Sequence, residues 1–183
     1  MVDSSPGGSS PGMSRRGFLK LGLVGGGLLA MAGVTTTVIH WPGTTPAPDF
    51  HVLRPGDLSF LEALIPVVLA GALPSDDDTT GTNETLKGLD HMLWYYSPGN
   101  RKELLQLFDL VTLPVTRGPL TGVWGGWERA SSEDVQVFLG RWETSSIATL
   151  RMAHHALLQI IPMAWYSRPV AWSHAGYPGP PTL

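Results

Sequence analysis

Residues 147–161, Ile-Ala-Thr-Leu-Arg-Met-Ala-His-His-Ala-Leu-Leu-Gln-Ile-Ile, show the clearest structural pattern in this chain of 183 residues. Apolar side chains recur there at the spacing of an α-helix and would form one wide buried face: Ile147, Leu150, Ala153, Leu157, Leu158 and Ile161. We expect this helix to begin at Ser145 or Ser146. We expect Pro162 to disrupt it, because the proline ring excludes the hydrogen bond to the residue four positions earlier.

The same helical spacing follows Asp57, which we place at the N-cap of a first helix. Pro66 is expected to kink or reset that helix. A polar loop over residues 75–83 then leads into a second helix that ends at Tyr96. The second helix has one apolar stripe, formed by Leu86, Leu89, Leu93 and Tyr96.

Two further helices are indicated by their starting residues. Ser97 followed by Pro98 is typical of an N-cap and the first residue of a helix. Proline has no backbone N–H, but an N–H in the first turn would have no partner within the helix. Ser131 and Asp134 approximate a capping box. Residues 117–129, between these helices, are expected to form a loop. This loop carries two indoles that could cover the core or meet a partner, Trp124 and Trp127.

No segment shows the convincing alternation of a strand, so the sequence predicts an all-α fold, an irregular orthogonal bundle of five or six helices. The helical domain would span residues 57–166. The prolines of residues 40–56 favour an extended linker before it. After it, residues 167–183 are expected to form an extended arm rich in aromatic residues and proline, which needs a surface on its own bundle or on another chain.

The stretch Ser14-Arg15-Arg16-Gly17-Phe18-Leu19-Lys20 precedes an uncharged segment, residues 21–39. Paired arginines followed by Phe-Leu-Lys look like a twin-arginine export signal. We therefore expect residues 1–39 to be a signal or anchor segment, and the protein to be periplasmic or membrane-associated. Ala30-Met31-Ala32 resembles a peptidase site with cleavage before Gly33, while retention of residues 21–39 as a membrane anchor stays open.

Composition excludes several kinds of protein. The chain contains no cysteine, which excludes disulfides, thiolate zinc sites and iron–sulfur ligation by cysteine. Without residues 1–39 it has nine basic and fourteen acidic residues, a net charge of −5. That balance argues against a nucleic-acid-binding surface, which needs clustered Lys and Arg.

The sequence contains no recognisable catalytic constellation. His154 and His155 form its one tandem imidazole pair, and adjacent helical positions diverge by about 100°, so the two cannot share one metal ion. A metal or haem role for them is the minor alternative. Met152 and Met163 could ligate haem, but methionine in a helical stripe more often fills the core.

Three features together resemble one family: the twin-arginine leader, an early helix ending in Ala63-Leu64-Ile65-Pro66, and a terminal Trp172 followed by Gly176-Tyr177-Pro178-Gly179-Pro180. The chain looks like a member of the gluconate 2-dehydrogenase subunit 3 family. These proteins are small subunits of bacterial flavin-dependent dehydrogenases of the glucose-methanol-choline type.

The resemblance implies a role without catalysis or a cofactor of its own. Such a subunit binds a catalytic subunit that carries FAD, helps it mature and exports it through the twin-arginine translocase, and a cytochrome c could accept the electrons. We expect aromatic residues and a proline to dock on the catalytic subunit: Trp165, Tyr166, Trp172, Tyr177 and Pro178. The alternatives are a free-standing periplasmic helical binding protein and a redox protein using His154 or His155.

Overall fold

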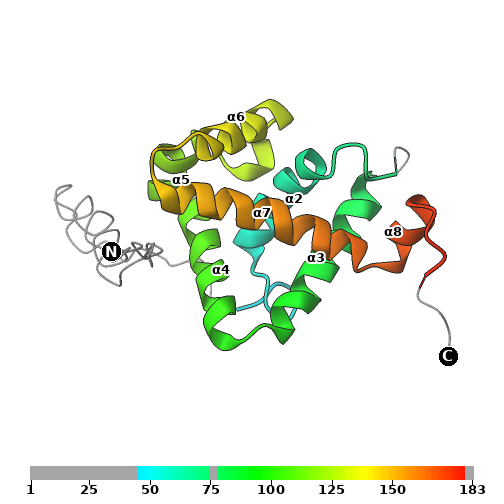
Figure 1. Cartoon of the computed structure of the whole chain (residues 1–183). Coiled ribbons are helices and arrows are strands. Elements are labelled where there is room, and N and C mark those ends of the chain that lie inside the picture. The colour runs from blue at the N-terminus through cyan, green and yellow to red at the C-terminus, as the bar shows by residue number, and fades with distance from the viewer. Residues whose placement is uncertain (1–44, 75–77, 180–183) are drawn as a thin grey trace, which may run out of the picture. The chain divides into compact units, whose positions relative to one another are not determined.

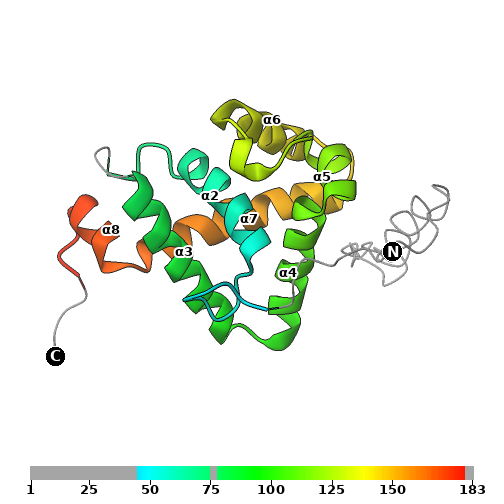
Figure 2. The same ribbon diagram turned by 180° about the vertical axis from the view of Figure 1, so that it is seen from behind.

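Helix α2 lies at the centre of the fold, where α3, α4, η1, α6 and α7 all pack against it. The structure is a computed structural model that describes residues 45–74 and 78–179 (Figure 1). Helix α7 crosses the front in Figure 1 and lies behind α2 in Figure 2. The helices are α2 (Pro55–Val68), α3 (Asp78–Tyr95), α4 (Pro98–Thr112), α5 (Pro114–Thr121), the 3-10 helix η1 (Trp127–Arg129), α6 (Ser132–Glu143), α7 (Ala148–Tyr166) and α8 (Pro169–His174).

Every regular element within the described ranges is helical, which confirms the predicted all-α class. Those ranges contain seven α-helices, more than the five or six expected, because α5 and α8 form where a loop and an extended arm were predicted. The helices of the described ranges include none that is both long enough and apolar enough to cross a membrane.

Aromatic rings form the centre of the core. The Phe60 ring on α2 lies 4.9 Å from that of Trp127, which in turn lies 5.6 Å from the Phe138 ring. The ring centres of Phe138 and Trp142 are 4.8 Å apart, and all three contacts are edge-to-face. The indole of Trp127 also donates a hydrogen bond to the Val111 carbonyl oxygen at 2.7 Å. Each such ring pair contributes about 0.5–1.5 kcal/mol beyond the burial of its area.

Two predicted helix caps are confirmed. The Ser97 hydroxyl oxygen accepts a hydrogen bond from the Asn100 amide at 3.3 Å, with Pro98 at the first helical position of α4. At α6 the Ser131 amide donates to the Asp134 carboxylate at 2.9 Å, and the Asp134 amide donates back to the Ser131 hydroxyl at 3.1 Å. Local sequence alone thus determines where these two helices begin.

The predicted N-cap of α2 is wrong. Arg54 is the N-cap and Pro55 the first helical residue, so Asp57 occupies the third position, where its carboxylate accepts the Arg54 amide at 2.9 Å. An aspartate at the N-cap or at the third helical position can accept a hydrogen bond from a backbone amide that the helix leaves unpaired. For this reason the sequence suggested that the helix starts after Asp57.

The folded part also begins earlier than the predicted linker allows. Ala47, Val52 and Leu53 are buried although they lie within residues 40–56. Helix α3 likewise starts at Asp78, inside the segment expected to be a loop. Residues 1–44, 75–77 and 180–183 lie outside the described residues, and with them the whole predicted export signal.

Neither of the two prolines that were expected to interrupt a helix ends it at once. Helix α2 continues past Pro66 to Val68, and α7 continues past Pro162 to Tyr166. Pro162 deprives the Leu158 carbonyl of its helical donor. Leu158 is exposed, so water can satisfy that carbonyl and the helix tolerates the proline.

Two predictions of irregular structure are corrected. Residues 114–121 form α5, which begins with Pro114 and ends at Gly122, a residue with a positive φ of 85°. The arm expected to be extended contains α8, whose Ala171 is buried. A proline at the first helical position starts each of these short helices.

Candidate partner-binding face

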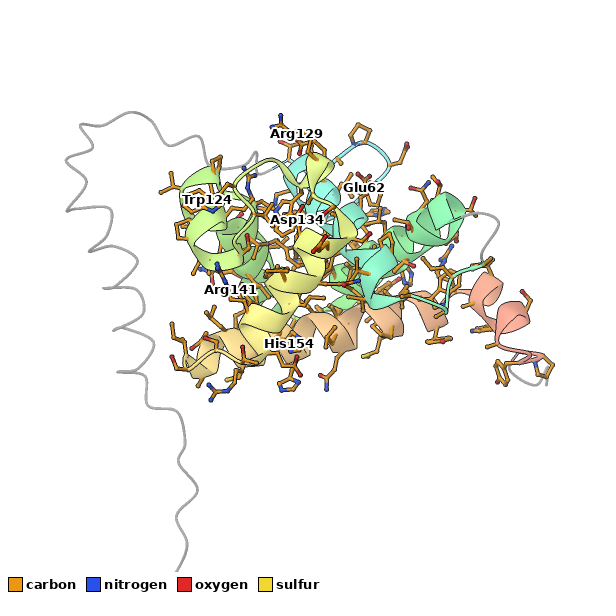
Figure 3. The ribbon with its side chains drawn as sticks, turned by 90° about the horizontal axis from the view of Figure 1, so that it is seen from above. Glu62, Trp124, Arg129, Asp134, Arg141 and His154 are labelled. Carbon is orange, nitrogen blue, oxygen red and sulfur yellow. The ribbon has the colours of Figure 1, made fainter. Side chains whose placement is uncertain are left out.

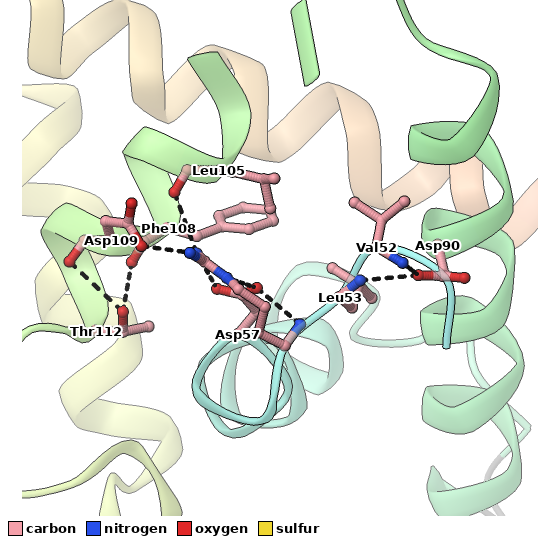
Figure 4. Close-up of polar contacts among 9 residues, drawn as sticks. Val52, Leu53, Asp57, Asp90, Leu105, Phe108, Asp109 and Thr112 are labelled. Atoms are coloured by element: carbon pink, nitrogen blue, oxygen red, sulfur yellow. Dashed lines mark hydrogen bonds and ion pairs between the residues drawn. The ribbon is translucent and has the colours of Figure 1, made fainter. Parts of the chain in front are cut away.

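A buried ion network joins α2 to α4 (Figure 4). The Arg54 guanidinium donates to both Asp57 carboxylate oxygens at 2.8 and 2.9 Å, and its Nη2 lies 2.7 Å from Asp109 Oδ1. The hydrogen bond with Asp57 is the largest cause of the raised pKa of Arg54 and outweighs its burial. One cation thus contacts two carboxylates, and these contacts give the network a structural role in joining the start of α2 to α4.

The Asp90 carboxylate on α3 holds the chain just before α2 (Figure 4). It accepts the amides of His51, Val52 and Leu53 at 2.9, 2.8 and 2.9 Å. Burial alone would raise the pKa of Asp90, but these N–H groups stabilise the charged form and lower it overall. The same carboxylate also lies 3.1 Å from Nδ1 of the His51 imidazole, so Asp90 ties α3 to the segment before α2 through backbone and side chain together.

The histidine pair divides between core and surface. His154 is buried where α7 runs beside α6, and His155 is exposed, with 5.6 Å between the two ring centres (Figure 3). Burial is the main cause of the lowered pKa of His154, with Glu143 opposing it. Nowhere in the described ranges do three side chains of the kinds that bind metals converge.

The outer side of α7 carries an apolar face that the described helices leave uncovered. Met152, Met163 and Tyr166 are 54%, 57% and 49% exposed. Helical spacing of three or four residues places His155 and Gln159 between them on the same side, while Leu157, Ile161 and Trp165 point into the core. We call the exposed set the α7 face: Met152, His155, Leu158, Gln159, Met163 and Tyr166.

Helix α8 is fixed against the end of this face. The Trp172 indole donates to the Tyr166 carbonyl oxygen at 2.8 Å, and its ring lies edge-to-face with Tyr177 at 5.9 Å. On the other side, Arg168 Nη2 lies 2.7 Å from Glu84 Oε2 on α3. Arg168 is the main cause of the lowered pKa of Glu84.

The predicted docking residues separate into two groups. Tyr166, Tyr177 and Pro178 are exposed, and Trp172 is half-buried by its own chain. Trp165 is fully buried in the core, which corrects its assignment to a partner surface. Trp165 precedes Tyr166 in one helix, so the two side chains point about 100° apart, and here the first faces the core while the second faces outward.

Sequence reasoning missed the two methionines of the α7 face, which it assigned to core filling. Both are more than half exposed. The available signal was their spacing: Met152, Gln159, Met163 and Tyr166 repeat at seven, four and three residues, on the side opposite to Leu157 and Ile161.

A second group of exposed rings lies at the end of α3 and in the loop that follows α5. Tyr95 is 74% exposed and Trp124 is 78% exposed, whereas Trp127, the other indole of the predicted loop, is buried. Trp124 lies beside α5 in Figure 3, with its ring over Gly118. Tyr95 belongs to α3 and Trp124 follows α5, so these two rings come from different elements, whereas the α7 face comes from one helix.

A comparison of the chain with family models, with curated proteins and with solved structures finds no match in any of the three.

Proposed function

We propose that this chain is a non-catalytic small subunit that binds a flavin-dependent dehydrogenase, helps it mature and takes it through the twin-arginine pathway. The observation that carries the proposal is the uncovered α7 face, with three of its apolar side chains about half exposed. Exposed apolar stripes of this kind are typical of surfaces that another protein covers.

The polar clusters support the same role. Arg54 and Asp90 are each occupied by partners inside the fold. Arg168 is likewise occupied by Glu84. These charged side chains thus contact the protein's own helices, while the outer side of α7 is left uncovered. This combination fits a subunit better than an enzyme.

The resemblance supplies the kind of partner and the route. Arg15 and Arg16 would address both chains to the translocase, and FAD would belong to the partner. A cytochrome c acceptor would then receive electrons from the partner's flavin, and membrane association would come from residues 21–39 if they are retained.

The test is co-expression of this chain with the protein encoded by the neighbouring open reading frame, which the proposal expects to be a flavin-dependent dehydrogenase. Changing Arg15→Lys and Arg16→Lys should keep both proteins in the cytoplasm, and deleting this chain should lower the FAD content of the dehydrogenase. The matched control is Arg129→Lys with Arg141→Lys, two exposed arginines of the folded body. Export of the dehydrogenase at its normal level without this chain would exclude the role of an escort.

A further inference from the structure

Charge is distributed unevenly between the α7–α8 end of the chain and the rest. Residues 45–143 contain fourteen acidic and seven basic residues, whereas no Asp or Glu follows Glu143. Arg151 and Arg168 are the two basic residues after that point, apart from histidines. Helices α7 and α8 therefore carry no carboxylate side chain on a protein whose body is otherwise acidic.

The two arginines differ in what they contact. Arg168 is paired with Glu84 inside the fold. Arg151 is exposed, donates to the Ser145 carbonyl oxygen and makes no ion pair within the described ranges. Leu158 follows Arg151 by seven residues, or about two helical turns, so both lie along the same edge of the α7 face.

We infer that the α7 face docks on an apolar patch of the dehydrogenase that is bordered by carboxylates, with Arg151 as the charged contact at its edge. This inference rests on the proposed function and specifies its surface. An apolar centre with a charged rim is the usual composition of a protein interface, in which rim charges steer association and fix orientation.

An anionic lipid surface is the other apolar, negatively charged partner to which the α7 face could bind. Binding to anionic lipid generally needs a cluster of about four to eight Lys or Arg. The α7 face has one unpaired arginine, and the acidic body around it would be repelled by an anionic leaflet. A protein partner needs only local carboxylates opposite Arg151, so the observations favour the protein.

The experiment measures affinity between the full chain and the co-expressed dehydrogenase, each purified with the partner removed. Met163→Glu replaces the most exposed apolar side chain of the face, at 57%, with a carboxylate and should weaken binding at least about 30-fold, because a charge would then be buried among apolar contacts. Arg151→Glu should weaken it about three- to tenfold and reduce its dependence on salt. Val137→Glu on α6 and Arg129→Glu on η1 are the matched controls, because both wild-type side chains are exposed and neither belongs to the α7 face.

The outcomes separate this inference from the proposed function. If the wild-type chain does not bind the dehydrogenase, the proposed function fails. If it binds and both α7 variants bind equally well, the function stands and this surface is wrong. Circular dichroism checks that the variants fold. A third measurement tests binding to vesicles of phosphatidylglycerol. If Met163→Glu abolishes vesicle binding but leaves the complex with the dehydrogenase intact, the α7 face binds lipid and the inference of a protein partner is overturned.

Discussion

The indole nitrogen of Trp172 donates a hydrogen bond to the carbonyl oxygen of Tyr166 at 2.8 Å. Tyr166 is the last residue of α7, where carbonyl groups lack helical donors, so this bond satisfies one of them and fixes α8 against the helix end. The α7 face and the aromatic end of the chain are therefore one continuous structure, even though the sequence between them contains Pro169.

We expect Trp172→Phe to loosen α8 while the rest of the fold persists. The ring is kept and the donor is lost, which removes about 1 kcal/mol, or roughly a fivefold increase in local opening. Hydrogen exchange of the amides of residues 171–177 reports the change, with the amides of α2 as an internal reference. Trp94→Phe, at an exposed ring on α3, should leave that exchange unaltered.

The crossing of α3 and α7 depends on Gly88. A Cβ at this position would lie 2.5 Å from the Ala164 carbonyl oxygen, a backbone atom that cannot rotate away. Gly88→Ala should therefore lower the free energy of unfolding by about 1–3 kcal/mol, the usual cost of overpacking. Urea denaturation measures the change.

Gly140→Ala is the matched control, because a Cβ there meets nothing within 4 Å inside α6. Alanine favours a helix over glycine by about 0.5–1 kcal/mol, so this variant should be slightly more stable than the wild type. Equal stability of the two variants would contradict the close packing of α3 against α7.

The buried position of Arg54 predicts a strong effect of its removal. Arg54→Met would leave the carboxylates of Asp57 and Asp109 without their cation in a largely buried place. Breaking a buried pair in this way costs about 3–5 kcal/mol. Thermal unfolding measures the loss, and Arg129→Met, at an exposed arginine, should shift the midpoint very little.

The sequence predicted the helices whose signals are local. The stripe of Leu86, Leu89 and Leu93 is buried as expected, and the caps at Ser97 and Ser131 start their helices. Each of these follows from residues within one or two turns of each other, so the short-range pattern contains the information.

Elements determined by tertiary contact were not predictable in the same way. Helix α5 contains Gly118 and Pro119, both poor helix formers, and Trp124 packs on the glycine. Helix α8 depends on Trp172 reaching Tyr166 and on Arg168 reaching Glu84, a residue 84 positions away. Composition indicated an extended arm because neither contact can be read from neighbouring residues.

The candidate face illustrates the same limit. The predicted apolar stripe of residues 147–161 is only partly buried, because α7 has apolar residues on more than one side. Leu157 and Ile161 lie in the core, whereas Ile147 and Leu158 are 47% and 36% exposed. Trp165 and Tyr166 look equivalent in the sequence, and the α3 and α6 helices that pack on α7 decide that one is core and the other surface. The methionines were assigned to the core for the same reason.

Burial of His154 makes the stability of the fold depend on pH. Its pKa is lowered from 6.5, so the unfolded state binds a proton more readily than the folded state. Its contribution is therefore fully present above about pH 6.5 and is lost as the pH falls from there through the folded pKa. The lowered pKa of Asp90 adds a separate loss at more acidic pH, near its unfolded value of 3.8 and below.

We therefore expect urea midpoints of the wild type to fall between about pH 7.5 and about pH 5.0, and those of His154→Leu to fall less, because leucine has no proton to gain. His91→Gln, at an exposed histidine of α3, is the control and should keep the wild-type difference. An equal loss in His154→Leu and the wild type would show that other groups govern this pH range. Because Asp90 titrates lower, stopping at pH 5.0 keeps its contribution largely out of the comparison.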